Sequence, residues 1–257
     1  MKKSTRKSPN KKIKYGYGWI PDFPDHRDFL YTAIKPRKVK LPSSVDLRNL
    51  CSAVEDQGQL GSCTANALVG NLEFILNKIR GRYTDLSRLF IYYNERVLEH
   101  TVDTDSGAML RDGIKTLHRQ GVCFERDWPY VIKNFAVHPP LDLYEGAQGN
   151  IITTYHRLLT HDDRLTCLTE GYPFVFGFTV YESFESPQTA RTGIVPMPKK
   201  SERVLGGHAV LAVGFDQKTK RFLVKNSWGT GWGMEGYFTM PFQYLETLAD
   251  DFWTIHK

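Results

Sequence analysis

The change from helical to strand periodicity along this 257-residue chain constrains its fold most strongly. Between Leu68 and Ile79 the apolar residues recur at the spacing of a helix that buries one face, and Gly81 is suited to end that helix. Residues 87–99 and 109–120 are two further helix candidates, the second of which is ended by a glycine. The first half of the chain is therefore predicted to be mostly helical.

Short apolar runs replace the helical pattern after a proline-containing connection at 138–141. Gly, Asp and Lys turns separate these runs, which are YPFVFGFTV, HAVLAVGF, RFLVKNSW and GYFTM, as expected for strands. A helical lobe at about 41–140 followed by a β lobe at about 141–257 gives an α+β fold. Ligand sites tend to lie between such lobes, so a functional cleft is expected at their junction.

Charge is concentrated in the first forty residues. Residues 1–40 hold twelve Lys or Arg and three Asp, a net charge of +9, whereas the remaining chain carries 22 basic and 25 acidic residues. We interpret 1–40 as a basic leader in which residues 1–14 are disordered, because they lack apolar periodicity. Clustered cations attract phosphate, so an anionic partner for residues 1–14 is one hypothesis, and a solvated tail is the other.

Composition argues against several classes of protein. Apolar residues make up 41% of the chain, enough for a core, but no apolar run approaches the roughly 20 residues of a membrane-spanning helix, so no membrane insertion is expected. The basic N-terminus lacks the apolar stretch of a secretory signal, which favours an intracellular protein. His and Cys do not cluster at ligand spacings, so neither a metal nor another cofactor is expected. Whether Cys51, Cys123 and Cys167 pair stays open.

Three residues form a candidate catalytic set. Cys63 begins the helix predicted after Ser62, where free N–H groups and a partial positive charge stabilise a thiolate. His208 starts an apolar strand and Asn226 follows another. An imidazole can pair with the thiolate and protonate a leaving amine, and an amide can orient that imidazole. Trp228 is placed to cover this contact.

The segments around these residues, DQGQLGSCTANA, GGHAVLAVGFD and KNSWGTGWG, resemble in this order the papain-like cysteine peptidases. The resemblance covers roughly residues 41–255. It implies a two-lobe fold, helical plus β-barrel-like, and hydrolysis of polypeptide substrates through a covalent acyl-enzyme. It also implies that Cys63 is the nucleophile, His208 the general base and acid, Asn226 the orienting group and Gln57 an oxyanion-hole donor.

The resemblance implies a substrate-binding surface as well. Residues 105–107 are expected to pair with extended peptide backbone, although they also fit an ordinary loop before a helix. Trp228 is placed beside the catalytic contact. A pocket for the second residue before the scissile bond is expected in the β lobe, near Gly177, Gly206 and residues 249–251. At its floor Asp250 is expected to accept Arg or Lys as well as apolar side chains, unless it is a solvated surface carboxylate. These candidates are Asp105, Ser106 and Gly107 for the pairing segment, and Gly177, Gly206, Gly207 and Asp250 for the pocket.

Two departures from the family pattern are informative. Leu60 replaces the cysteine that normally forms a disulfide beside the site, and Thr64 replaces an aromatic residue. That disulfide cannot form, which agrees with a reducing compartment. The leader is too short for the helical inhibitory pro-domain of lysosomal relatives and resembles that of short-leader members from prokaryotes and large DNA viruses. An intracellular or virion-associated location is therefore expected.

The segment at 15–31, YGYGWIPDFPDHRDFLY, suggests how activity is controlled. It is rich in aromatic residues, Pro and Asp, and is expected to lie on a surface in an extended form. Tethering gives it a high effective concentration, so one hypothesis is that it occupies the cleft as a built-in inhibitor. The alternative is that it packs on the back of the protein.

Other functions remain open at this point. An exopeptidase, a ligase or another amide hydrolase can use the same catalytic residues as an endopeptidase. A structural protein associated with nucleic acid through its basic arm is a hypothesis of another class. The presence of Cys63, His208, Asn226 and Gln57 together argues against it, because a decayed site has no need of all four.

Overall fold

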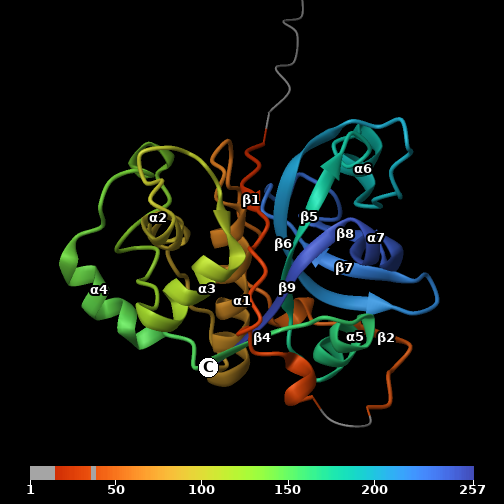
Figure 1. Cartoon of the computed structure of the whole chain (residues 1–257), viewed down its shortest axis with the longest axis horizontal. Coiled ribbons are helices and arrows are strands. Elements are labelled where there is room, and N and C mark those ends of the chain that lie inside the picture. Colours follow the sequence, from red (N-terminus) through yellow and green to blue (C-terminus); the bar gives the residue numbers. More distant parts are fainter. Residues whose placement is uncertain (1–14, 36–38) are drawn as a thin grey trace, which may run out of the picture.

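The computed structural model describes residues 15–35 and 39–257. The predicted disorder of residues 1–14, and their predicted anionic partner, lie outside the described residues. Figure 1 shows a helical lobe and a β lobe side by side, with the N-terminal segment crossing the molecule between them. This is a mixed α+β fold, as predicted.

The helical lobe is built around α1 (Cys63–Arg80), whose residues from Cys63 to Leu76 are all buried. Gly81 ends the helix in the left-handed conformation, with a φ of 65°, as its position in the sequence indicated. The other two predicted helices are also confirmed, as α2 (Arg88–Leu98) and α3 (Leu110–Arg119). The lobe is completed by α4 (Leu141–Ala147) and by short 3-10 helices at 48–50, 132–134 and 148–150.

The β lobe holds a seven-stranded sheet in the order β4-β9-β5-β6-β7-β8, and β2 pairs with β6 beyond the end of β5. All of these strand pairs are antiparallel. Among the described residues the sheet does not close into a barrel, because β4 and β8 remain its two edges. The strands are β2 (Ser44–Asp46), β4 (Thr154–Arg157), β5 (Phe174–Tyr181), β6 (Val204–Asp216), β7 (Arg221–Lys225), β8 (Tyr237–Pro241) and β9 (Ala249–His256).

Besides α4, three helices of the second half were not predicted from the strand-like texture of that region. They are α5 (His161–Thr169), α6 (Pro187–Thr192) and α7 (Phe242–Thr247). The first has a local signal, a capping box in which Thr160 and Asp163 exchange hydrogen bonds. No helix in the described ranges is long and apolar enough to cross a membrane.

The N-terminal segment docks on both lobes. Strand β1 (Trp19–Ile20) pairs in parallel with β3 (Ala108–Met109) of the helical lobe and also contacts β6 of the sheet. Farther along, a 3-10 helix at 31–33 contains the buried Tyr31, which packs in the apolar core of the β lobe. The segment is therefore extended, as expected, and lies along the junction of the lobes (Figure 1).

Candidate active site

The four predicted catalytic residues converge at the junction of the lobes. Cys63 is the first residue of α1, His208 lies on β6, and Asn226 directly follows β7. The Nε2 atom of His208 and the Oδ1 atom of Asn226 are 2.8 Å apart, so the amide oxygen orients the ring by accepting its N–H. The indole of Trp228 stacks on the imidazole with ring centroids 4.8 Å apart, which covers this contact as expected.

Cys63 and His208 are neighbours across the lobe junction. The backbone N–H of Ala209, the residue after His208, is directed at the sulfur of Cys63. The Nδ1 atom of His208 is buried and, among the described residues, has no hydrogen-bond partner. This nitrogen is therefore free to exchange a proton with a group placed beside it.

Burial holds both groups in their neutral forms in this structure. It raises the pKa of the Cys63 thiol to about 12, an effect opposed by the N–H groups of Ala209 and Gly18. It lowers the pKa of His208 to about 4, an effect opposed by the hydrogen bond to Asn226. A thiolate–imidazolium pair is disfavoured as long as both groups are shielded from water.

Gln57 precedes Cys63 in a loop and directs its amide nitrogen into the junction. Its Nε2 donates to the carbonyl oxygens of Gly16 (3.1 Å) and Leu60 (2.9 Å), and its Oε1 accepts from the hydroxyl of Ser227 (2.6 Å). The Ser227 contact fixes which end of the amide carries the donor. The Nε2 donor of Gln57 faces the backbone carbonyl of Gly16 in the N-terminal segment.

Residues 15–18 cover the predicted catalytic residues. Tyr15 stacks on Trp228 at a centroid distance of 4.2 Å, and the ring of Tyr17 meets His208 edge to face. With this cover in place the side chains of Cys63 and His208 are both 0% exposed. The thiol of Cys63 is therefore inaccessible to an external substrate in this conformation.

Trp19 fills the place predicted for a substrate side chain. Its ring lies against Gly177 and Gly207, and a Cβ atom at Gly177 would come within 1.9 Å of it. Tyr17 lies in the same way against Gly206. Asp251 lies beside this ring, since Trp19 Nε1 donates to Asp251 Oδ2 at 3.1 Å.

The two neighbouring carboxylates differ in environment. The side chain of Asp250 is 67% exposed and contacts Arg157, whereas that of Asp251 is 1% exposed. A register irregularity between β5 and β9, together with a positive φ of 56° at Asp251, turns the buried carboxylate toward the pocket. The Asp251 carboxylate therefore contacts the Trp19 ring, whereas the role of Asp250, which pairs with Gly177 across the sheet, stays a prediction.

The predicted backbone-pairing segment divides into two parts. Gly107 and Ala108 approach the N-terminal segment: a Cβ at Gly107 would lie 2.2 Å from the carbonyl oxygen of Gly18, and Ala108 N–H donates to that oxygen at 2.7 Å. Asp105 instead accepts from the N–H of Gly61 at 3.0 Å, which holds the loop before Cys63. The hydroxyl of Ser106 donates a hydrogen bond to the hydroxyl of Thr101 within the same loop.

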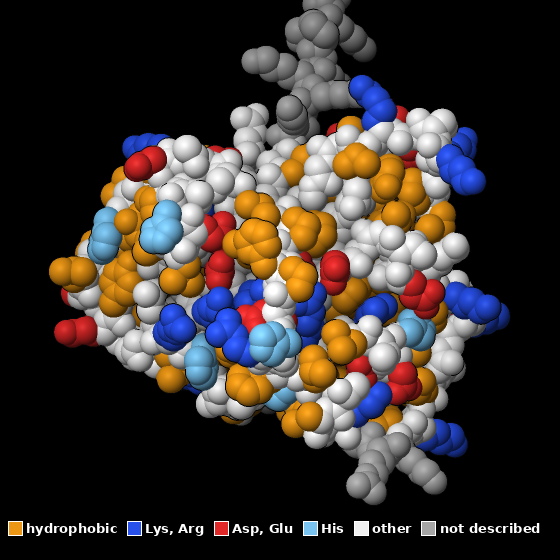
Figure 2. Space-filling model, viewed as in Figure 1, with side chains coloured by type: hydrophobic (Ala, Val, Ile, Leu, Met, Phe, Trp, Pro, Cys, Tyr) orange, Lys and Arg blue, Asp and Glu red, His pale blue; other side chains and the backbone are white. Residues whose placement is uncertain are grey.

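A cluster of charged residues farther along the N-terminal segment was missed by the sequence reasoning. The carboxylate of Asp28 accepts from Nε (3.0 Å) and Nη2 (2.6 Å) of Arg111 and from Nη1 (3.0 Å) of Arg157. Asp22 accepts from the backbone N–H of Arg111 and from the indole of Trp253. Three Asp within a basic leader were the available signal. Figure 2 shows Lys and Arg side chains gathered on the face that this segment crosses.

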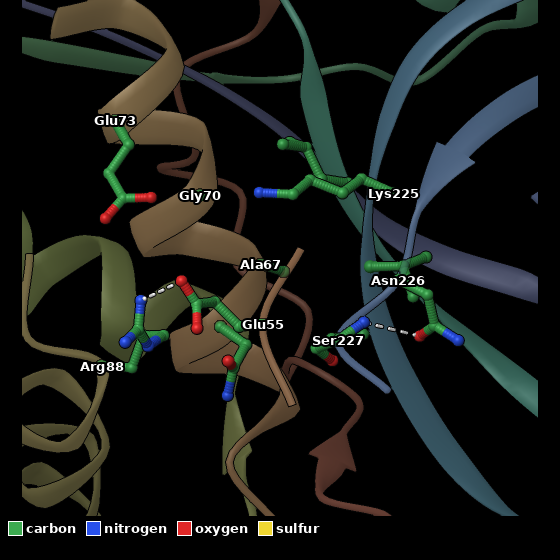
Figure 3. A pocket seen from close by; sticks show the side chains of 12 residues that line it. Glu55, Ala67, Gly70, Glu73, Arg88, Lys225, Asn226 and Ser227 are labelled. Atoms are coloured by element: carbon green, nitrogen blue, oxygen red, sulfur yellow. Dashed lines mark hydrogen bonds and ion pairs between the residues drawn. The ribbon is translucent and has the colours of Figure 1, made fainter. Parts of the chain in front are cut away.

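A second cluster of charged side chains lies behind the predicted catalytic residues, in a narrow pocket between α1 and the sheet (Figure 3). Lys225 comes from the strand that ends at Asn226 and donates to the hydroxyl of Ser52 at 2.7 Å. Burial raises the pKa of Glu73 on α1 to about 7 and lowers that of Lys225. Arg88 contacts Glu55 at the other end of the pocket. These groups link the lobes behind the site rather than facing the N-terminal segment.

Comparison with known proteins agrees with this geometry. A family model described as papain family cysteine protease matches residues 41–246. An uncharacterized peptidase C1-like protein of Acanthamoeba polyphaga mimivirus is 45% identical, over 95% of this chain and 88% of its own length. The solved structure of xylellain, a cysteine protease from Xylella fastidiosa, is 42% identical, with a TM-score of 0.88 over 98% of this chain and 99% of that chain.

A longer relative shows a different relation. Cathepsin L1 of Drosophila melanogaster is 28% identical over 81% of this chain, but the match covers only 56% of the cathepsin. The viral and bacterial proteins, by contrast, match along nearly their whole length. These similarities agree with the predicted resemblance to members from prokaryotes and large DNA viruses.

Proposed function

We propose that this chain, which belongs to the papain family of cysteine proteases, cleaves internal peptide bonds through a thioester formed on Cys63 and is held inactive by residues 15–31. It is a cysteine peptidase that acts on polypeptides. The observation that carries the finer proposal is the complete burial of Cys63 and His208 beneath the N-terminal segment. A thiol without accessible surface cannot attack a substrate.

The proposed reaction begins when the segment leaves and water or substrate reaches the site. His208 then takes the proton of Cys63, and the resulting thiolate attacks the carbonyl carbon of the scissile bond. The negative oxygen formed in this step is stabilised by the Gln57 amide and by the backbone N–H of Cys63. His208 gives its proton to the leaving amine, and a thioester remains that water hydrolyses to regenerate the thiol.

An endopeptidase is favoured over an exopeptidase by the path of the N-terminal segment. The segment passes Trp228 at Tyr15, crosses Cys63 at Gly18 and continues beyond Trp19 to Asp28. A continuous chain is therefore accommodated on both sides of the thiol. The same catalytic residues also suit an exopeptidase, a ligase or another amide hydrolase, and product analysis distinguishes these activities.

The proposed control by residues 15–31 rests on three kinds of contact. The Gly16 carbonyl engages the donor of Gln57, the backbone of Gly18 pairs with Ala108, and the ring of Trp19 fills the pocket beside Asp251. A substrate needs the oxyanion-hole donor and the same surface. Binding of the segment and of a substrate are therefore mutually exclusive.

The test is thiol labelling at mildly acidic pH, where ordinary thiols are protonated. Iodoacetamide labelling is followed by intact mass in the full chain, in Cys63→Ala, and in a chain cut after folding at a protease site introduced at 36–38. We expect slow labelling of the full chain, rapid single labelling of the cut chain after its leader is removed, and loss of that label in Cys63→Ala. Absence of selective labelling in the cut chain contradicts the catalytic assignment, and equal rates in cut and full chains contradict the inhibition.

The products that the cut chain forms from a protein substrate distinguish an endopeptidase from an exopeptidase and from a ligase. A folded protein of unrelated sequence, incubated with the enzyme and analysed by mass spectrometry, should yield internal fragments. Release of single residues or dipeptides from one end indicates an exopeptidase instead. Transfer of an added amine into the product indicates a ligase.

A further inference from the structure

We propose that Arg111 and Arg157 form a carboxylate-binding subsite that takes an acidic side chain of a bound polypeptide substrate once the N-terminal segment has left. This inference rests on the proposed function, because it places a substrate on the path now occupied by residues 15–31. It concerns a surface beyond the pocket of Trp19.

The present occupant of the subsite is Asp28. Its two carboxylate oxygens receive three hydrogen bonds from the two guanidinium groups, two of them from the fork of Arg111. The side chains of Asp28 and Arg111 are each 9% exposed. Charge-assisted, forked contacts of this kind are stronger and more selective for geometry than ordinary hydrogen bonds.

Departure of the segment removes the hydrogen-bond acceptors that the guanidinium of Arg111 has among the described residues. These acceptors, the carboxylate of Asp28 and the carbonyl of Phe23, both belong to the departing residues. The ion-pair partner of Arg111 among the described residues is likewise Asp28. A carboxylate that enters this place can restore the forked, charge-assisted contacts that Asp28 makes now.

The subsite keeps its shape after that departure. Arg157 remains bound to Asp250 (3.2 Å) and Asp251 (2.9 Å), both on β9 of the β lobe. The guanidinium carbons of Arg111 and Arg157 lie 5.7 Å and 5.5 Å from the centroid of the same Trp253 ring. The shared aromatic ring limits the movement of both guanidinium groups. The two side chains therefore lose little conformational entropy when a carboxylate binds.

The subsite is continuous with the cleft. Asp22 lies three residues beyond Trp19, and its backbone N–H donates to Asp251, the residue that also receives the Trp19 indole. Its carboxylate accepts from the backbone N–H of Arg111. A polypeptide that fills the Trp19 pocket and continues in the same direction reaches the two arginines.

The binding test uses the Cys63→Ala protein, cut at 36–38 after folding and freed of its leader, so that it does not depend on catalysis. The probes are a labelled peptide of residues 15–31 and its Asp28→Asn form, and fluorescence anisotropy gives their affinities after equilibration. We expect the Asp28→Asn peptide to bind about tenfold more weakly at low salt, with a smaller difference at 0.5 M salt. The difference should shrink on Arg111→Gln and on Arg111→Lys, which keeps the charge but loses the fork.

The substrate test uses the cut chain with its thiol intact. Peptide libraries are compared in which one position at a time is fixed as Asp or as Asn, and kcat/KM is normalised to thiols titrated with an epoxide. We expect one position on one side of the scissile bond to favour Asp by about tenfold, and Arg111→Gln to abolish that ratio. Arg203→Gln, a matched change at an arginine that is 81% exposed and paired with Glu182, should leave the ratio unchanged.

The outcomes separate this proposal from the proposed function. Normal epoxide titration without any preference for Asp, or with a preference that Arg111→Gln and Arg111→Lys leave intact, overturns the subsite. Equal binding of the two peptides to the Cys63→Ala protein overturns it as well. Failure of the titration contradicts the catalytic assignment, and the peptide-binding result then decides the subsite by itself.

Discussion

Replacement of Trp19 by Ala is expected to open the active site of the full chain. The indole fills the pocket formed with Gly177 and Gly207, and its N–H donates to Asp251. Loss of a half-buried aromatic ring costs about 2 kcal/mol when scaled down from full burial. Loss of the hydrogen bond adds about 1 kcal/mol. Together they weaken closure by about 3 kcal/mol, a factor of about 100 in the closed-to-open ratio.

The assay is the rate of Cys63 labelling by a thiol-directed epoxide. Because only the open form reacts, the rate should rise by about 100-fold in Trp19→Ala, up to the limit set by the cut chain. Trp19→Phe keeps a ring but loses the N–H, so its rate should rise by about tenfold or less.

Phe23→Ala provides the matched control. This leader aromatic is 72% exposed, so its removal should change the labelling rate by no more than about twofold. Circular dichroism and thermal unfolding verify that each variant is folded. Labelling of Trp19→Ala at the rate of the unsubstituted chain would refute the reasoning, because the pocket contact would then contribute nothing to closure.

Three further predictions concern pH, catalysis and stability. Burial and the nearby Asp22 carboxylate raise the pKa of Asp251 to about 7 in the closed form, so protonation favours closure, and peptide binding should weaken as the pH rises through 7; Asp251→Asn should flatten this profile, and an unchanged profile would count against it. Gln57→Ala should lower kcat of the cut chain by about 10²–10³, measured with a fluorogenic peptide, and an unaltered kcat would remove Gln57 from the oxyanion hole. Ser52→Ala leaves the buried ammonium of Lys225 without its hydroxyl acceptor and should lower the free energy of unfolding by about 1–3 kcal/mol in urea titrations, whereas unchanged stability would show that this bond contributes little.

Sequence reasoning succeeded where structure is determined locally. The helix that begins at Cys63 has its apolar stripe and its terminal glycine within one short window, and the strand carrying His208 is a single apolar run. Local patterns of this kind specify an element and its ends without knowledge of its partners. The helices at 161–169, 187–192 and 242–247 are short and lie among strands, so they left no comparable periodicity.

Features that depend on register or on long-range contact were less accessible. The position of the Asp251 carboxylate depends on one irregularity between β5 and β9, and a shift by one residue exchanges the two faces of a strand. The partners of Asp28 come from α3 and β4, more than 80 residues away in the sequence. The aromatic character of residues 15–31 suggested a docking segment, but nothing local indicated the arginines that receive it.

Gly16 and Gly18 of the N-terminal segment pass against the backbone of the loop before Cys63. A Cβ atom at Gly18 would lie 1.6 Å from the carbonyl oxygen of Gly61, and one at Gly16 would lie 2.4 Å from that of Gln59. Backbone atoms cannot yield as a flexible side chain can, so any larger residue at either position lifts the segment away from Cys63. Most random substitutions in an enzyme reduce its activity, whereas substitutions at these two glycines should increase it. A genetic screen for gain of proteolysis in the uncut chain should therefore recover changes at positions 16 and 18. Such changes should be dominant in a cell that also carries the unsubstituted enzyme.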